Sequence, residues 1–242
     1  MVSDTDRHNQ RVLLKISGEA LQGNLSHGID ESVLNYVVDQ VLEVRNCGIE
    51  TAIVVGGGNY FRGITGGRIP RTEGDFMGML ATLMNAIAIS SFFQNRGIPS
   101  APMSSFENGG HVDVFNAHRA QKLLSEGHVL VFGGGTSNPF FTTDTAAVLR
   151  ALEIRADVLV KATKVDGIFD KDPEKFSDAV KIPSISYSEV LERNLRVMDG
   201  AAIALARDNK LPVRIVNLRI KGAMKTALTT GETGSIVVPD GH

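Results

Sequence analysis

The chain has 242 residues, of which 43% are hydrophobic, and its 25 lysines and arginines nearly balance its 27 aspartates and glutamates. This length and composition suit one large α/β domain with a substantial buried core. The near-neutral charge and the lack of a basic block argue against a nucleic-acid-binding surface.

The cysteine and histidine content indicates neither a disulfide nor a metal site built by the protein. Cys47 is the single cysteine, which excludes an internal disulfide and suits a reducing compartment, so we expect a cytoplasmic protein. Its place in a helical pattern just before Gly48 favours a buried structural thiol over a nucleophile. The six histidines are scattered, without a Cys/His cluster.

Predicted strands and helices alternate along the chain after a polar tail at residues 1–10, which lacks the pattern of a signal peptide. Strands are predicted at residues 11–16, 51–55, 101–103, 128–132, 158–161, 213–216 and 236–238. Helices are predicted after Asp30, over 76–95, from Asn116 to Gly127, after Asp144, after a capping box at Ser186–Glu189, and after Asp199. This alternation predicts a three-layer αβα sandwich around a mostly parallel sheet.

The predicted helix at residues 76–95, FMGMLATLMNAIAISSFFQN, carries no charge over a length that could span a bilayer. Polar residues interrupt it, and the sequence has no second such segment. We therefore interpret it as a buried central helix or a subunit interface rather than a membrane span. Its small side chains, such as Ala81 and Ala86, would let another helix approach, so we expect a homo-oligomer.

Four predicted strands end in polar loops that contain glycine, namely KISG at 15–18, GGGN at 56–59, GGGT at 133–136 and KATKVDG at 161–167. The carboxyl ends of parallel strands meet at one edge of a sheet, where ligands bind. Four such loops at one edge predict a large, multiply charged ligand such as a nucleotide. Neither the P-loop pattern GxxxxGK[ST] nor the Rossmann pattern GxGxxG occurs, which argues against both of those classes.

The third of these loops belongs to the segment VFGGGTSNPFFTTD at residues 131–144, which leads from a strand into a helix. Glycines allow the backbone to approach a ligand, and a helix N-terminus supplies N–H groups and a positive dipole. The segment therefore predicts an anion-binding loop. A plainer interpretation, in which Thr143 or Asp144 only caps the helix, stays open.

Five ordered motifs point to a known family: KISGEAL (15–21), GDFMGMLATLMN (74–85), GTSNPFFTTDTAA (135–147), KATKVDGIFDKDP (161–173) and VMDGAAIALARDNKLP (197–212). From Arg11 to about Val238, the chain resembles the bacterial uridylate (UMP) kinases of the amino acid kinase superfamily. One position departs from the pattern, because Ser137 stands where the family has glycine in GTGNPFFTTD. A serine there adds a Cβ at a position where we expect a positive φ, which is uncommon for serine.

The resemblance implies the amino acid kinase fold and the reaction ATP + UMP → ADP + UDP in pyrimidine nucleotide biosynthesis. It implies an acceptor lobe at about 11–150 and an ATP lobe at about 151–240. It also implies a hexamer, activation by GTP and inhibition by UTP. Two alternatives are a non-catalytic nucleotide sensor and a superfamily relative that acts on a carboxylate or carbamate.

The same resemblance implies three catalytic residues, Lys15, Arg62 and Asp144. Lys15 and Arg62 would contact phosphate oxygens, although a lysine at a strand end or a surface arginine can also be merely solvated. Asp144 would orient Lys15 or nearby donors rather than accept a proton, because the acceptor phosphate is already anionic. Mg²⁺ would arrive bound to ATP, without protein ligands.

The remaining implied residues bind the two nucleotides. Those implied for UMP are Gly57, Asp75, Thr136, Ser137, Asn138, Pro139, Phe140, Phe141, Thr142 and Thr143. Those implied for ATP are Lys15, Ile16, Ser17, Gly18, Gly58, Arg62, Thr163, Phe169 and Asp172. From the residues themselves, Asp75 could instead cap the long helix, Asp172 could form a turn with Pro173, and Phe140 and Phe141 are interpreted as core anchors rather than base-stacking platforms.

Overall fold

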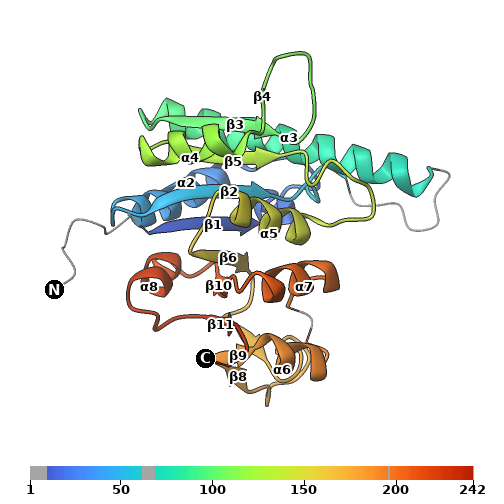
Figure 1. Cartoon of the computed structure of the whole chain (residues 1–242), viewed down its shortest axis with the longest axis vertical. Helices are drawn as coiled ribbons and strands as arrows, with labels where there is room; N and C mark the ends of the chain where they lie inside the picture. The colour runs from blue at the N-terminus through green and yellow to red at the C-terminus, as the bar shows by residue number, and fades with distance from the viewer. Residues whose placement is uncertain (1–9, 62–68, 196, 242) are drawn as a thin grey trace.

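The structure, a computed structural model, describes residues 10–61, 69–195 and 197–241. Within these ranges strands and helices alternate along most of the chain, as Figure 1 shows. The strands are β1 (Arg11–Ile16), β2 (Glu50–Val55), β3 (Ser100–Ser104), β4 (Asp113–Val114), β5 (Val129–Gly133), β6 (Val158–Thr163), β7 (Ile168–Phe169), β8 (Lys181–Ile182), β9 (Ser184–Ser186), β10 (Val213–Asn217) and β11 (Ser235–Val238). The helices are α1 (Gly18–Leu21), α2 (Glu31–Arg45), α3 (Arg71–Asn95), α4 (Ala117–Ser125), α5 (Thr143–Glu153), α6 (Tyr187–Glu192), α7 (Gly200–Asp208) and α8 (Ala223–Thr229).

One sheet organises these elements. Its nine strands lie in the order β4-β3-β5-β2-β1-β6-β10-β11-β9, and Figure 1 shows them stacked from β3 near the top to β9 near the bottom. Neighbouring strands are parallel except for β10 and β11. The short strands β7 and β8 form a separate antiparallel pair. The predicted mostly parallel sheet is confirmed.

Helices cover both faces of the sheet because successive side chains of a strand point in opposite directions. Val12, Leu14 and Ile16 of β1 pack in one cluster with apolar side chains of α2, α3 and α8. Leu13 packs in a second cluster with side chains of α4, α5, α6 and α7. Since both faces are buried, the central strands are continuous apolar runs, and the predicted three-layer sandwich is confirmed.

The predicted capping residues begin their helices as expected. Asp30 accepts from the backbone of Ser32 at the start of α2, and Asn116 caps α4. Ser186 and Glu189 form the predicted capping box of α6.

The thiol of Cys47 is exposed, so the prediction of a buried structural thiol is wrong. Helix α2 ends at Arg45, and Cys47 lies in the turn that follows, beyond the apolar face that packs on the sheet. Its Sγ lies 3.4 Å from the carbonyl oxygen of Glu43.

Helix α3 divides its apolar side chains between the core and the surface. Ala86, Ile89 and Phe93 are fully buried against the sheet. A second set is largely exposed, namely Phe76, Met77, Leu80, Met84 and Ile87. By length and composition alone this helix could also cross a membrane, and half of its most apolar stretch is buried inside the structure.

Helix α3 passes so close to the ends of β2 and β5 that glycine is required there. A Cβ atom built on Gly57 would lie 2.8 Å from the carbonyl oxygen of Gly78. One built on Gly133 would lie 2.7 Å from the Cα of Leu83. Gly57 and Gly133 are therefore needed for helix packing, whatever ligand they also approach.

Replacing Gly133 with alanine should destabilise the protein, because backbone atoms of α3 must move to admit the new methyl group. We expect the Gly133→Ala variant to lose about 1–3 kcal/mol of unfolding free energy, measured by urea denaturation. The matched control is Gly200→Ala, where a Cβ meets nothing within 4 Å. That variant should stay within about 0.5 kcal/mol of the parent protein. Equal losses in the two variants would contradict this packing argument.

Candidate functional site

The four glycine-containing loops lie at one edge of the sheet. The strands that precede them, β5, β2, β1 and β6, are consecutive in the sheet and parallel. Their carboxyl ends therefore meet, and the predicted ligand-binding edge has the expected architecture.

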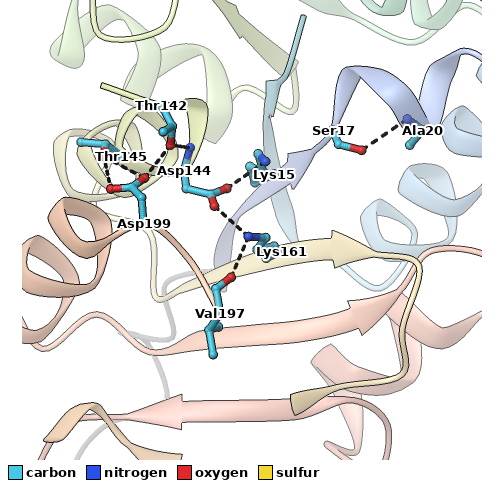
Figure 2. A network of polar contacts seen from close by, with 9 residues as sticks. All are labelled: Lys15, Ser17, Ala20, Thr142, Asp144, Thr145, Lys161, Val197 and Asp199. Atoms are coloured by element: carbon cyan, nitrogen blue, oxygen red, sulfur yellow. Dashed lines mark hydrogen bonds and ion pairs between the residues drawn. The ribbon is translucent and has the colours of Figure 1, made fainter. Parts of the chain in front are cut away.

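Asp144 lies between two lysines at this edge (Figure 2). The Nζ of Lys15 is 2.8 Å from Oδ1 of Asp144, and the Nζ of Lys161 is 2.7 Å from Oδ2. Lys15 and Lys161 are register partners on β1 and β6, so their side chains leave the sheet on the same face. Asp144 comes from the first turn of α5, which packs over that face. We call these three residues the Lys15–Asp144–Lys161 cluster.

The cluster is charged although it is largely buried, with side-chain exposures of 11% for Lys15, 12% for Asp144 and 19% for Lys161. Burial alone would raise the pKa of Asp144, but the charges and hydrogen bonds of the two lysines outweigh it and hold this pKa below its ordinary value. Burial lowers the pKa of Lys161. The charge of Asp144 opposes this shift, and the neighbouring charge of Lys15 adds to it. Two positive charges against one negative charge suit the binding of an anion.

Thr142, rather than Thr143 or Asp144, caps helix α5, so the plainer interpretation of Asp144 is wrong. The Oγ1 of Thr142 accepts from the backbone N–H of Asp144 at 3.0 Å. The hydroxyl groups of Thr142 and Thr145 donate to the carboxylate of Asp199, which also caps α7 as predicted (Figure 2). Asp199 therefore joins the N-termini of two helices, and this frees Asp144 for the lysines.

A cavity of about 320 Å³ opens beside the N-terminus of α5. Its lining residues come from α3, from the glycine loops at 56–59 and 133–136, and from the segments that follow these loops. They are Gly57, Gly58, Phe61, Gly74, Asp75, Gly78, Met79, Thr82, Gly135, Thr136, Phe141, Thr142 and Thr143. Six of the residues predicted for UMP are among them, namely Gly57, Asp75, Thr136, Phe141, Thr142 and Thr143. The other four, Ser137, Asn138, Pro139 and Phe140, lie on the same loop outside the lining.

Asp75 anchors this loop to helix α3. It is the fifth residue of α3, whose N-cap is Pro70, so the interpretation of Asp75 as a helix cap is wrong. Its Oδ2 accepts from the backbone N–H of Phe140 at 2.7 Å. Arg71 lies 3.6 Å from the same oxygen and stacks over the Phe140 ring, 5.0 Å from its centroid.

The backbone of the loop is strained at two residues. Ser137 has φ +65° and Phe140 has φ +72°, a region that residues with a side chain seldom adopt. The expected positive φ at Ser137 is thus confirmed. Phe140 and Phe141 are 60% and 50% exposed, so the interpretation of these rings as core anchors is wrong. The loop leaves the sheet edge here and carries both rings away from the core.

A second cavity, of about 630 Å³, lies beyond Lys161. It is lined by three residues predicted for ATP, Thr163, Phe169 and Asp172, and by apolar side chains that include Leu195 and Ile215. Lys161 lines this cavity, and Asp144 directly follows Thr143, which lines the first, so the Lys15–Asp144–Lys161 cluster is adjacent to both cavities. Asp172 forms the turn that its place before Pro173 suggested, accepting from the N–H of Glu174.

The other residues predicted for ATP lie at the ends of β1 and β2. Ser17 caps the short helix α1, and Ile16 is fully buried in the core. A Cβ on Gly18 would lie 2.6 Å from the backbone nitrogen of Gly58, so these two glycine loops touch. Arg62, predicted as a phosphate ligand, lies outside the described residues.

A buried pair of side-chain amides, Asn59 and Asn85, holds the glycine loop at 56–59 in place. The side chains of Asn59 and Asn85 donate to each other, at 2.9 and 2.7 Å. Asn85 also donates to the carbonyl oxygen of Gly56, and Asn59 donates to that of Gly28. Because both side chains are buried and satisfied, they tie the loop to helix α3 rigidly.

The residues that the structure describes contain no group of three or more histidine, cysteine, aspartate or glutamate side chains that could hold a metal ion. Both carboxylate oxygens of Asp144 already face ammonium groups. The donor set of this site thus consists mainly of cations and N–H groups, which favour an anion over a bare cation.

Lys161 is the site residue that the sequence analysis missed. A signal was present, because β1 and β6 share the pattern Val-Leu-x-Lys, with Lys15 and Lys161 at the same position of the pattern. Asp199 was predicted only as a cap, and its bonds to Thr142 and Thr145 have no sequence signal.

Comparisons with known proteins agree with this architecture. The family model described as "Amino acid kinase family" matches residues 10–217. The chain is 50% identical over 216 residues to the uridylate kinase of Helicobacter hepaticus, which covers 88% of this chain and 92% of that protein. It is 46% identical over 226 residues to the uridylate kinase of Sulfurimonas denitrificans, and this match covers 92% of this chain and 95% of that protein. The crystal structure of UMP kinase from Bacillus anthracis is similar with a TM-score of 0.91 at 33% identity, covering 97% of this chain and 98% of the other.

Replacing Asp144 with asparagine should destabilise the protein at neutral pH, because two buried ammonium groups lose their counterion. We expect a loss of about 3 kcal/mol in unfolding free energy near neutral pH. Since the folded-state pKa of Asp144 is lowered, its contribution is present above the ordinary carboxyl pKa and is lost as the pH falls through the lowered value. The difference between parent and variant should therefore shrink in acid, as measured by urea denaturation from about pH 7 to about pH 3.

The matched control for this experiment is Asp178→Asn. Asp178 also pairs with a lysine, Lys171, at 2.6 Å, but it is largely exposed. That variant should change the unfolding free energy by less than about 1 kcal/mol. A difference between parent and Asp144→Asn that is small at neutral pH, or constant down to acid, would contradict the ionic role of Asp144.

Proposed function

The chain belongs to the amino acid kinase family, and on this premise we propose that it is a UMP kinase, which transfers the γ-phosphoryl group of ATP to UMP and forms UDP and ADP in pyrimidine nucleotide biosynthesis. The family match confirms the resemblance predicted from the five motifs. The names of the relatives support UMP as the acceptor. The observation that carries the proposal is the Lys15–Asp144–Lys161 cluster adjacent to two cavities.

Phosphoryl transfer depends on positioning and on stabilisation of charge at the transferring group more than on covalent chemistry of the protein. Lys15 and Lys161 supply two ammonium groups beside the cavities, where their burial strengthens electrostatic interactions. The phosphate of UMP is already ionised and attacks without losing a proton to the protein. Asp144, with both oxygens facing lysines, then acts by holding the two ammonium groups in place.

We assign UMP to the cavity of about 320 Å³, as its lining of backbone and hydroxyl groups supports. The N-terminus of α5, at Thr142 and Thr143, presents N–H groups and a positive dipole to the UMP phosphate. Oδ2 of Asp75 accepts from the backbone N–H of Phe140. We assign to Oδ1 of the same carboxylate the role of accepting from a ribose hydroxyl.

We assign ATP to the cavity of about 630 Å³. Its apolar side chains, among them Ile168, Phe169 and Leu195, suit the flat adenine ring, and Lys161, which also lines it, would contact the phosphates. Ser17, Gly18 and Gly58 would contact the phosphates from the neighbouring loops, together with Arg62. Mg²⁺ bound to ATP would neutralise phosphate charge during the transfer.

The positions of the lining residues support the proposed division into an acceptor lobe and an ATP lobe near residue 150. The residues that line the acceptor cavity lie between Gly57 and Thr143. Those that line the donor cavity lie between Lys161 and Ile215. Helix α5 (Thr143–Glu153) spans this boundary and carries Asp144 in its first turn.

We further propose that the protein is a homo-oligomer that assembles through helix α3. Its exposed residues Phe76, Leu80, Met84 and Ile87 recur every three or four positions and so form one apolar stripe on the helix. A hexamer, activation by GTP, inhibition by UTP and a cytoplasmic location stay predictions from the family resemblance.

The reaction itself is tested by coupling ADP release to a spectroscopic assay with ATP and each of UMP, CMP, dCMP and acetylglutamate. UMP should be turned over fastest, because the names of the relatives support UMP as the acceptor. The Lys15→Ala variant should lower kcat by about 10²–10³ with little change in UMP affinity, since the ammonium group acts on the transferring phosphoryl. Lys122, an exposed lysine of α4, is the matched control, and Lys122→Ala should leave kcat unchanged.

Two results would count against this proposal. Turnover of acetylglutamate above UMP would indicate a relative that phosphorylates a carboxylate. UMP binding without turnover in the parent protein would indicate a nucleotide sensor.

Assembly is tested with a charge on the α3 stripe. The parent protein should sediment as an oligomer in analytical ultracentrifugation. Met84→Glu should sediment as a smaller species, because a charge buried in an apolar interface is unfavourable. Val180 is also exposed but lies outside α3, so Val180→Glu should keep the parent assembly. A monomeric parent, or an unchanged Met84→Glu variant, would refute assembly through α3.

A further inference from the structure

Arg150 is a buried charged residue that the proposed reaction does not use directly. It lies on α5, six residues after Asp144, and only 8% of its side chain is exposed. A guanidinium group is costly to bury unless its N–H groups are paired. The partners that offset this cost therefore indicate what the residue does.

The guanidinium group contacts three side chains. Its Nη1 pairs with Glu153, one turn further along α5. Its Nη2 donates to the Oγ of Ser105 at 3.2 Å, and its plane lies over the ring of Phe115, 3.9 Å from the centroid. Burial lowers the pKa of Arg150, and the charge of Glu153 opposes this shift.

Ser105 and Phe115 are the two ends of one segment, residues 105–115, which contains the short strand β4 and lies between β3 and α4. The ends are also held together by the backbone, since the N–H of Phe115 donates to the carbonyl oxygen of Ser104 at 2.8 Å. Arg150 thus contacts both ends from the adjacent helix. Between them, Phe106 packs against Phe76 of α3, with ring centroids 5.5 Å apart.

This segment supports the acceptor loop from behind. The Oγ of Ser105 donates to the carbonyl oxygen of Gly135 at 2.7 Å, and the N–H of Ser105 donates to that of Gly133 at 3.1 Å. Phe106 lies so close to Gly134 that a Cβ there would be 3.0 Å from the ring. Gly135 itself lines the acceptor cavity.

A hydroxyl group has a single proton, so the direction of these bonds is determined. Ser105 accepts from Arg150 and donates its proton to the carbonyl oxygen of Gly135 at 2.7 Å, which is closer than that of Gly133 at 3.2 Å. Because the donor to Ser105 is charged, it strengthens the hydrogen bond that the Ser105 hydroxyl group donates to Gly135. Two successive hydrogen bonds therefore connect Arg150 through Ser105 to Gly135, which lines the acceptor cavity.

We propose that Arg150 is a positioning residue for the acceptor site, which fixes the loop at Gly135 through Ser105 and by holding both ends of segment 105–115. This inference rests on the proposed function, because it takes the cavity beside Gly135 as the UMP site. Arg150 touches neither nucleotide cavity itself. Its loss should therefore weaken the use of UMP and leave the use of ATP unchanged.

The test compares steady-state kinetics of Arg150→Met, Ser105→Ala and the double variant with those of the parent protein. Each single variant should raise the KM for UMP about tenfold, with kcat and the KM for ATP within about twofold. The double variant should resemble Arg150→Met, because the two residues act in series and their effects do not add. Arg119→Met is the matched control, since Arg119 pairs with Asp113 of the same segment but is largely exposed. It should leave all three constants unchanged.

Thermal melting of every variant separates positioning from general damage. If Arg150→Met does not fold, Ser105→Ala carries the test, because Ser105 is only partly buried. Equal rises in the KM for UMP and for ATP, or an unchanged KM for UMP in Ser105→Ala, would overturn the inference. UMP turnover by the parent protein reports separately on the proposed function, and its absence would overturn both.

Discussion

The arrangement of the site depends on the repulsion between two lysines. Lys15 and Lys161 are register partners on adjacent parallel strands, so their ammonium groups emerge side by side from a face that is otherwise apolar. Asp144 makes this arrangement stable by placing one oxygen against each lysine. The carboxylate can reach that position only if the N-terminus of α5 is docked between β1 and α7, which the bonds of Asp199 to Thr142 and Thr145 achieve. The site is thus built around an excess of positive charge, and a phosphate group would complete the neutralisation.

The acceptor side is held from several directions because its loop is strained. Ser137 and Phe140 both have positive φ, and Phe140 and Phe141 are exposed, so the loop gains little from burial. Asp75 fixes it from α3, and Ser105 fixes it from the segment after β3. Strain of this kind persists only where the surrounding structure determines the conformation. Helix α3 has a central part in this, since it supplies Asp75, closes on Gly57 and Gly133, and presents an apolar stripe outward.

Much of the fold could be predicted, since its signals are local. Strand β1 was predicted with its observed ends, and the capping residues Asp30, Asn116 and Ser186 each bond to an amide two or three residues away. The elements that were missed, such as β4, β7 and β8, are two residues long and cannot show a period. The errors at Cys47, Asp75 and Phe140 share one cause. In each case the residue type was interpreted without knowing where the helix began or ended, or which way the loop left the sheet.

The sequence by itself determined the alternation of strands and helices, the meeting of four glycine loops at one sheet edge, the family, and the positive φ at Ser137. These follow from side-chain period, from the stereochemistry of glycine and from motif order, all of which act over a few residues. Only the tertiary structure decided that Lys161 joins Lys15 at Asp144, that Asp75 anchors Phe140, and that Arg150 reaches Gly135 through Ser105. These contacts join elements that are far apart in the chain. They depend on strand register and helix docking, which no local pattern specifies.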